Sequence, residues 1–233
     1  MNHAYELYIL SIENIDSSIV NKFIQYLSPG RQKKARNYRL EADTVRTVCG
    51  EMLLRYALSQ RSGSSLPEIP LHFTYNPYGK PLLSDYPDVS FNISHSGNWV
   101  ACAISDSGIG IDIEQISYDI DLNIANHYFH QKEIQIIRTT GAPESYHHFF
   151  RFWTAKECYL KCVGKGLSDP LNNFYVLDNT IILEGQITPW HIYFYDTLNN
   201  YALSVCSSLS YTEPVLPALV SIENILKCLS INI

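Results

Sequence analysis

The segment Gly110-Ile111-Asp112-Ile113-Glu114 alternates apolar and acidic side chains, which is the pattern of a strand with one buried face. Side chains alternate between the faces of a strand, so Ile111 and Ile113 are predicted to face a core while Asp112 and Glu114 project together. Two carboxylates on one face repel each other unless protons or a cation lie between them. They suit Mg²⁺, which binds one or two carboxylates and completes its shell with water and phosphate oxygens. By spacing alone, a solvated strand face explains the same pair.

Strand and helix patterns occur on both sides of this segment. Before it, strands and helices are predicted at residues 6–10, 17–27, a stretch ending near 60, 72–75, 89–94 and 99–105. After it, helices and then strands are predicted at residues 119–140, 147–163, 174–177, 180–183, 191–195 and 201–206. The turn between two strands is predicted at His95-Ser96-Gly97-Asn98, and Pro214 and Pro217 indicate an irregular tail. The mixture predicts an α+β fold whose halves divide near residues 106–117.

A second candidate site lies on the helix predicted over residues 147–163. Glu157 and Lys161 are four residues apart and share one helix face, in the favourable order of acid before base. The same helix is crowded with large apolar side chains: Phe149, Phe150, Phe152, Trp153, Tyr159 and Leu160. So apolar a helix leaves little solvated face, and charges on it need partners. An ordinary surface ion pair is the alternative interpretation.

A third candidate is a cluster of positive charge in an acidic chain. Five cations fall within nine residues, namely Arg31, Lys33, Lys34, Arg36 and Arg39, and Arg46 follows. Phosphate groups are natural ligands for such a patch, because guanidinium and ammonium groups bind them through charge-assisted hydrogen bonds. A solvated basic helix face explains the pattern equally well.

Ser94 and His95 place a hydroxyl beside an imidazole at the predicted turn. A hydrolase is not indicated, because sequence neighbours rarely form a nucleophile–base pair and no G-x-S-x-G motif occurs. Hydroxyls, backbone donors and a histidine at a turn suit the holding of a phosphate. The sequence also lacks the motifs of P-loop enzymes, dinucleotide oxidoreductases and zinc proteases.

Composition sets the broad class. The 233 residues fit one large domain or two of about 100 residues each. Apolar residues make up 46% and charged residues 17%, so the chain can bury a core. The net charge of −6 argues against a nucleic-acid partner. No signal peptide or membrane span is evident, so we expect a cytoplasmic protein whose six cysteines are reduced and buried.

Several of these segments occur together, in order, between about Ser28 and Phe174. They are Arg46-Thr47 with Gly50-Glu51, Tyr78-Gly79-Lys80-Pro81, Phe91-Asn92-Ile93-Ser94-His95-Ser96, Gly110-Ile111-Asp112-Ile113-Glu114, Trp153-Thr154-Ala155-Lys156-Glu157 with Lys161, and Gly164-Lys165-Gly166-Leu167. Together they resemble the signature of the Sfp-type 4′-phosphopantetheinyl transferases. Arg31 stands where that family often has lysine, which keeps the charge but changes the donor geometry. After about Leu177 the resemblance fades.

The resemblance implies two similar α/β lobes, a pseudo-dimer, with lobes over residues 1–108 and 109–233 and coenzyme A in the cleft between them. It implies that Asp112, Glu114 and Glu157 hold Mg²⁺, which Mn²⁺ can replace. The nucleotide end of coenzyme A would be held by Arg31, Lys34, Arg46 and Thr47, with Lys80 near the adenosine. Phosphates would be contacted by Ser94, His95 and Lys161. The expected catalytic residues are Glu157, Lys161, His95 and Glu133, the last at a family position that supports activity.

The implied reaction moves 4′-phosphopantetheine from coenzyme A to a serine of an acyl or peptidyl carrier protein and releases adenosine 3′,5′-bisphosphate. Such carriers serve fatty acid, polyketide or nonribosomal peptide synthesis, and the enzyme is expected to be a monomer. Leu167 and Leu171 are predicted to be exposed and to dock the carrier. Two alternatives stay open: a metal-dependent phosphohydrolase acting on nucleotides, and an inactive module that binds coenzyme A or a carrier.

Overall fold

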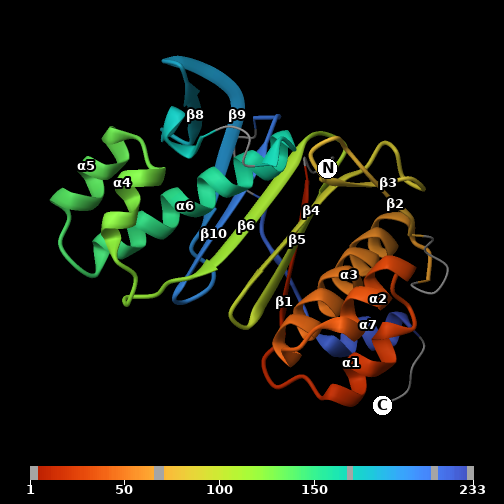
Figure 1. Ribbon diagram of the computed structural model, residues 1–233. Helices are drawn as coiled ribbons and strands as arrows, with labels where there is room; N and C mark the ends of the chain where they lie inside the picture. The colour runs from red at the N-terminus through yellow and green to blue at the C-terminus, as the bar shows by residue number, and fades with distance from the viewer. Residues whose placement is uncertain (1–4, 66–70, 167–169, 211–214, 230–233) are drawn as a thin grey trace.

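A computed structural model describes residues 5–65, 71–166, 170–210 and 215–229. Two sheets lie side by side at the centre, with helices grouped at either end (Figure 1). The first sheet has the strand order β11-β1-β5-β4. Its strands are β1 (Glu6–Ser11), β4 (Ser90–Ser96), β5 (Trp99–Ser105) and β11 (Ala218–Val220). A separate two-stranded ribbon contains β2 (Phe73–Tyr75) and β3 (Pro81–Leu83).

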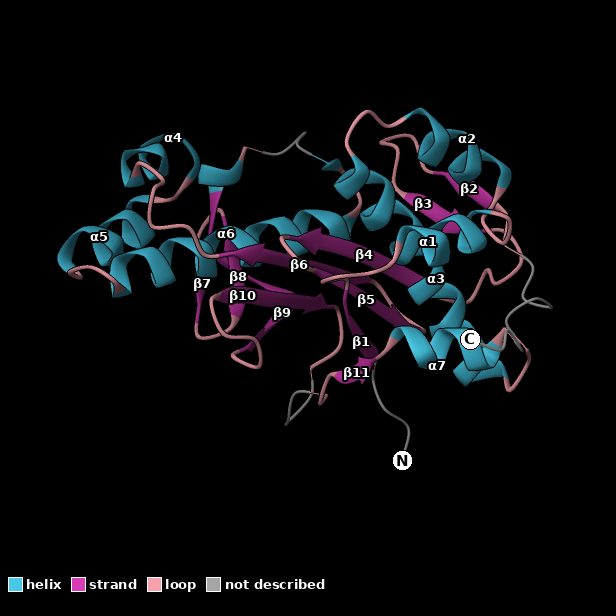
Figure 2. Ribbon diagram, turned by 90° about the horizontal axis from the view of Figure 1, so that it is seen from below, coloured by secondary structure: helices cyan, strands magenta, loops and turns pink. Residues whose placement is uncertain are grey.

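The second sheet has the order β6-β10-β9-β8-β7 and pairs antiparallel throughout. Its strands are β6 (Ile109–Gln115), β7 (Phe174–Leu177), β8 (Thr180–Leu183), β9 (Gln186–Tyr195) and β10 (Tyr201–Ser207). The first strand of this sheet, β6, lies next to β4, the last strand of the first sheet (Figure 2). The central strands therefore bring the two halves of the chain together.

The first sheet is covered by helices from both ends of the chain. They are α1 (Ser17–Ile24), α2 (Pro29–Asn37), α3 (Glu41–Ser62) and α7 (Ile222–Cys228). The long helix α3 is buried along most of its length and ends at Gly63, whose φ of 70° suits glycine. Ile225 and Leu226 of α7 pack into the same core. The last described segment thus completes the N-terminal half.

The second sheet is covered by α4 (Ala125–Tyr128), α5 (Gln131–Thr139) and α6 (Glu144–Val163). Short 3-10 turns lie at Leu122–Ile124 and Leu171–Asn173. Helix α6 packs directly on β6 at Gly110, where an added Cβ would overlap the Cys158 carbonyl oxygen and the Cys162 backbone nitrogen. The absence of a side chain at Gly110 therefore permits the closest approach of helix and strand.

A shared apolar core joins the two sheets. It includes Leu7 and Ile9 of β1, Ile111 and Ile113 of β6, and Val205 of β10. The buried hydroxyls of Tyr5 and Tyr195 lie 2.5 Å apart at the same junction. The predicted inward direction of Ile111 and Ile113 is confirmed, since both are fully buried. The free cysteines are buried as expected, apart from the partly buried Cys228.

Three expectations need correction. Strand β4 extends through Ser96, so Ser94, His95 and Ser96 lie on a strand, and the turn is only Gly97-Asn98. The predicted irregular tail contains β11 and α7, because β11 adds to β1 as a parallel strand. Leu171 is only 6% exposed and packs in a core, so it is not a docking residue. Leu167 lies outside the described residues.

The α+β class is confirmed by this mixture of sheets and helices. The division at residues 108/109 stays a prediction, to which the structure adds the return of β11 and α7 to the first sheet. Within the described residues, no helix is both long enough and apolar enough to cross a membrane.

Candidate active site

Three elements line a cavity of about 360 Å³ between the sheets. Strand β6 contributes Asp112 and Glu114, as the alternation of its side chains predicts. Helix α6 contributes Glu157 and Lys161, and β4 contributes Ser94 and His95, beside the apolar Ile93 and Trp153. The structure thus brings together six of the residues that the sequence singled out.

Asp112 is the most deeply buried of the three carboxylates that line this cavity, at 2% exposure. Its Oδ1 accepts hydrogen bonds from Ser94 Oγ at 2.8 Å and from Lys161 Nζ at 2.5 Å. Its Oδ2 is buried and has no hydrogen-bond partner among the described residues. Burial raises the pKa of Asp112, and the Lys161 ammonium only partly offsets that effect.

Glu114 and Glu157 are half-buried beside Asp112. Burial, followed by the negative charge of Asp112, raises the pKa of both carboxyls. Ser96 Oγ donates to Glu114 Oε2 at 2.8 Å and acts in the opposite direction on that pKa. Because the charge of Asp112 raises the pKa of both neighbours, the three carboxylates form a site to which positive charge is attracted.

These groups fit a hard divalent cation. Asp112 Oδ2 is an unsatisfied buried oxygen, and Glu114 and Glu157 line the same cavity. In the described part of the chain, no three His, Cys, Asp or Glu side chains are gathered tightly enough to enclose a metal ion alone. Mg²⁺ does not require such enclosure, because it keeps water and takes phosphate oxygens as further ligands.

Lys161 and His95 are the basic side chains that line the same cavity. Burial lowers the pKa of Lys161, but the charges of Asp112 and Glu157 outweigh it, so the pKa is raised and the ammonium persists. His95 lies on β4 and is exposed. Desolvation by surrounding atoms and the charges of Arg46, Lys161 and Arg31 lower the pKa of His95. The neutral imidazole is favoured there until an anion enters.

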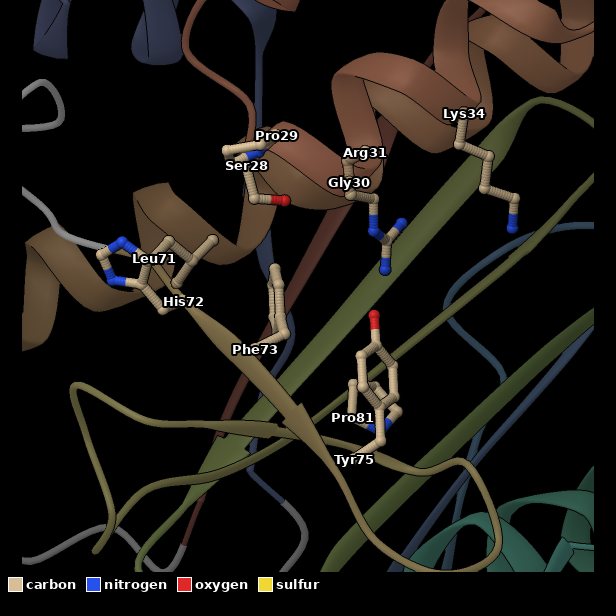
Figure 3. Close-up of a pocket in the computed structure, with 10 residues that line it drawn as sticks. All are labelled: Ser28, Pro29, Gly30, Arg31, Lys34, Leu71, His72, Phe73, Tyr75 and Pro81. Carbon is tan, nitrogen blue, oxygen red and sulfur yellow. The ribbon is translucent and has the colours of Figure 1, made fainter.

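A larger cavity of about 530 Å³ lies between α2 and the β2–β3 ribbon. Arg31 and Lys34 reach into it from α2, and the Arg31 guanidinium faces the Tyr75 hydroxyl across the opening (Figure 3). Phe73 forms part of the wall, with the Arg31 guanidinium 6.0 Å from its ring centre. Cations beside aromatic and apolar side chains suit a phosphorylated nucleoside.

A third cavity of about 230 Å³ lies between the other two. It shares Pro81 with the basic cavity and Glu157 and Lys161 with the carboxylate cavity. Asn92, Leu160 and the Tyr78-Gly79-Lys80 turn complete its walls. Through these shared lining residues the three cavities neighbour one another, and this path of neighbouring cavities runs from the cations of α2 to the carboxylates of β6. Its length suits a long ligand with phosphates along it.

The remaining predicted ligand residues are engaged with protein atoms. Arg46 Nη2 donates to the Gly97 carbonyl at 3.2 Å, and its Nη1 lies 3.4 Å from Asp43. Thr47 is buried and donates to the Tyr38 hydroxyl. Lys80 Nζ donates to the Cys162 carbonyl at 3.0 Å, at the end of α6, and to the Ile109 carbonyl.

Glu133 lies outside all three cavities. It is 1% exposed, closes a capping box with His130 at the start of α5, and pairs with Lys156 at 2.9 Å. Lys156 is fully buried and also donates to the carbonyls of Leu171 and Phe174. The structure therefore places Glu133 in a buried ion pair, and its expected role in activity stays a prediction.

Sequence reasoning missed several residues of the site. Ser96 contacts Glu114, Asn92 lines the third cavity, and Tyr75 faces Arg31. The alternation Asn92-x-Ser94-x-Ser96 was the available signal, since polar residues at every second position share one strand face. The predicted turn at His95-Ser96-Gly97-Asn98 hides this signal, because it places Ser96 outside the strand.

Comparison with known proteins assigns the class. Residues 16–107 match the family described as 4′-phosphopantetheinyl transferase, N-terminal, and residues 108–206 match the 4′-phosphopantetheinyl transferase superfamily. A path lined by cations and carboxylates between two α/β halves agrees with that match. The chain belongs to the 4′-phosphopantetheinyl transferase superfamily, enzymes that use coenzyme A as co-substrate.

Within the superfamily, the chain is similar to characterised bacterial proteins over most of its length. It is 35% identical to 4′-phosphopantetheinyl transferase Sfp of Bacillus subtilis over 192 residues, 80% of this chain and 84% of the relative. It is 36% identical to 4′-phosphopantetheinyl transferase gsp of Aneurinibacillus migulanus over 210 residues, 88% of this chain and 86% of the relative. The resemblance inferred from the motifs is therefore confirmed.

Proposed function

We propose that this enzyme transfers the 4′-phosphopantetheine group of coenzyme A to a serine of an acyl or peptidyl carrier protein, with Mg²⁺ at Asp112, Glu114 and Glu157. The path of neighbouring cavities between the α2 cations and the β6 carboxylates carries the proposal. It offers positive charge for a nucleotide phosphate at one end. At the other end it offers a cation site for a pyrophosphate.

Binding assigns roles to the two ends of the path. Arg31 and Lys34 would hold the 3′-phosphate, and Arg46, Thr47 and Lys80 would support the nucleotide end from the surrounding walls. Lys161 and His95 would contact the pyrophosphate oxygens, whereas the Ser94 hydroxyl, whose single proton goes to Asp112, would act on the phosphates only through that carboxylate. Because Lys161 lies 2.5 Å from Asp112, it would neutralise both a carboxylate and an incoming phosphate oxygen. We propose that lobes 1–108 and 109–233 supply these two ends.

In the reaction, the carrier serine oxygen forms a bond to the β-phosphorus, and the bond from that phosphorus to the bridging oxygen breaks. Adenosine 3′,5′-bisphosphate leaves with the electron pair. When bound, Mg²⁺ would stabilise the charge that develops on the pyrophosphate oxygens. Lys161 would stabilise the same charge from α6. Glu157, which reaches the cavity from a different element than Asp112 and Glu114, would accept the serine proton.

The products and the metal are tested together. The full-length protein is incubated with coenzyme A, Mg²⁺ and a candidate carrier, and the carrier is weighed by mass spectrometry. We expect its mass to rise by one phosphopantetheine group, with adenosine 3′,5′-bisphosphate released. EDTA should abolish the transfer, and Mg²⁺ or Mn²⁺ should restore it. Undiminished transfer in excess EDTA contradicts the metal assignment.

The same assay separates the alternatives. A phosphohydrolase would release phosphopantetheine without any carrier, because water would replace the serine. An inactive module would bind coenzyme A without releasing either product. We also propose that the enzyme acts as a monomer, since Asp112, Glu157 and Arg31 of a single chain line the path.

A further inference from the structure

The seam between the two sheets is closed by side chains. Within the described residues, β4 and β6 belong to separate sheets and share no backbone ladder. The side chains of three β4 residues take the place of the missing backbone ladder. The backbone N–H groups of β6 donate to them in a constant register: Ile111 to Asn92 Oδ1 at 2.8 Å, Ile113 to Ser94 Oγ at 3.4 Å, and Gln115 to Ser96 Oγ at 3.0 Å.

Two of the three rungs also hold a carboxylate. Ser94 Oγ donates to Asp112 Oδ1, and Ser96 Oγ donates to Glu114 Oε2, each at 2.8 Å. The residue in the corresponding place beside Asn92 is Gly110, which has no side chain to hold. Each serine therefore ties a carboxylate to the backbone of the strand that carries it, whereas Asn92 ties only the backbone.

We propose that Asn92, Ser94 and Ser96 form a polar ladder that joins the two sheets, and that its two serines are positioning residues that aim Asp112 and Glu114 at the cation. A serine hydroxyl offers one donor and two acceptor positions. Ser94 uses them all, donating to Asp112 and accepting from Ile113 N–H and from Lys161 Nζ at 3.2 Å. Because all three positions have partners, the Ser94 hydroxyl is held in a single orientation.

The ladder leaves the second oxygen of each carboxylate for the cavity. Ser94 and Lys161 both occupy Asp112 Oδ1, while Oδ2 stays unsatisfied among the described residues. Ser96 occupies Oε2 of Glu114 in the same way. Partners behind metal ligands orient them, and their loss typically weakens metal binding by about 10–100-fold. The positioning role rests on the proposed function, whereas the role as a seam does not.

The test compares Asn92→Ala, Ser94→Ala and Ser96→Ala with the wild type. Mn²⁺ is titrated calorimetrically into each protein saturated with coenzyme A, without a carrier. We expect the Mn²⁺ Kd to rise about tenfold or more in the two serine variants, and to rise much less in Asn92→Ala, because Asn92 lines the ligand path but holds no carboxylate. Each variant should lose about 2–4 °C in Tm or more, because each removes at least one hydrogen bond at the seam and the serine variants remove at least two.

Two further variants separate positioning from folding. Ser96→Thr keeps a hydroxyl and should restore the Mn²⁺ Kd. Ser59→Ala is the control variant: it removes a buried hydroxyl that donates to the Tyr56 carbonyl within α3, outside the cavities, and should leave the Mn²⁺ Kd unchanged. At saturating Mn²⁺, kcat of Ser96→Ala should approach the wild-type value.

Equal Mn²⁺ affinity in the wild type and the two serine variants would overturn the positioning role, as would an equal loss in Asn92→Ala. A wild-type protein that binds no Mn²⁺ contradicts the metal assignment instead. The ladder is then judged by Tm, and an unchanged Tm in Asn92→Ala and Ser96→Ala overturns it.

Discussion

At the scale of single residues, Glu157 has two candidate duties. It reaches the cavity from α6, opposite the two carboxylates of β6, so it can lie on the side from which the serine approaches. Glu157→Gln keeps the shape and one oxygen but loses the charge and most of the basicity. We expect coenzyme A binding to persist through Arg31 and Lys34, while kcat falls by about 10²–10⁴-fold.

The measurement is kcat of Glu157→Gln at saturating Mg²⁺, beside coenzyme A affinity by calorimetry. A near-normal kcat would show that the proton goes elsewhere. Loss of coenzyme A binding would show that Glu157 mainly retains the ligand and the metal. Glu133 lies outside the cavity, in a buried ion pair, so its role in activity stays a prediction.

Glu133 is also the subject of a stability prediction. Glu133→Gln leaves the Lys156 ammonium without its buried counter-charge, and breaking such a pair typically costs about 3–5 kcal/mol. We expect the free energy of unfolding to fall by that amount, measured by urea titration, while KM for coenzyme A of the folded fraction stays unchanged. Glu133→Gln/Lys156→Met removes both charges and should recover part of the loss. Wild-type stability in the single variant would exclude the buried pair as a structural element.

At the scale of elements, helix α2 carries a prediction about the substrate. If Arg31 and Lys34 hold the 3′-phosphate, dephospho-coenzyme A lacks the group that they bind. Charge-assisted hydrogen bonds contribute about 1.5–3 kcal/mol each, so kcat/KM should drop about tenfold or more. Lys34→Ala should reduce the preference for coenzyme A. Lys33→Ala is the matched control, because that neighbouring lysine does not line the cavity. Equal kcat/KM for both substrates in the wild type would assign α2 another role.

The elements also show what the sequence could predict. Strands β7, β8 and β10 were located to within a residue, because their periodicity and flanking turns are local signals. The same periodicity predicts that the two carboxylates of β6 share one face and that the charged pair of α6 shares another, but only the resemblance to a known family assigns them to a site. The β4–β6 seam was not predicted, because hydrogen bonds between residues 19 positions apart leave no periodic signal. The place of Lys80 near the adenosine stays a prediction; in the structure its ammonium donates to the Cys162 carbonyl near the end of α6.

At the scale of the whole molecule, the junction of the sheets contains a titratable pair. Burial raises the pKa of Tyr195 to about 12 and raises that of Tyr5 as well, both above the ordinary value of 10.0. The folded state thus holds these protons more tightly than the unfolded chain. The contribution of this pair to the free energy of unfolding should be fully present below about pH 10, and it should be lost as the pH rises toward the folded pKa.

The check is Tm measured between about pH 9 and about pH 11 for the wild type and for Tyr5→Phe/Tyr195→Phe. The double variant lacks the two buried phenols of this pair, so its Tm should decline less over this interval. Replacing both hydroxyls avoids leaving one of them buried and unpaired. Parallel declines in the two proteins would mean that alkaline unfolding begins elsewhere, for instance at the buried Tyr8.

The return of β11 and α7 to the first sheet has a consequence for synthesis. A chain emerges from the ribosome starting at its N-terminus, and N-terminal domains generally fold first. Here β1 lacks its parallel neighbour until β11 has been made, and the core beneath α3 lacks Ile225 and Leu226 until α7 has been made. The N-terminal half therefore completes its folding only after residues 218–228 have been translated. The two halves therefore do not fold one after the other, because the first half needs the last segment of the chain. A gene cut at codon 108 would yield a first half whose core lacks β11 and α7.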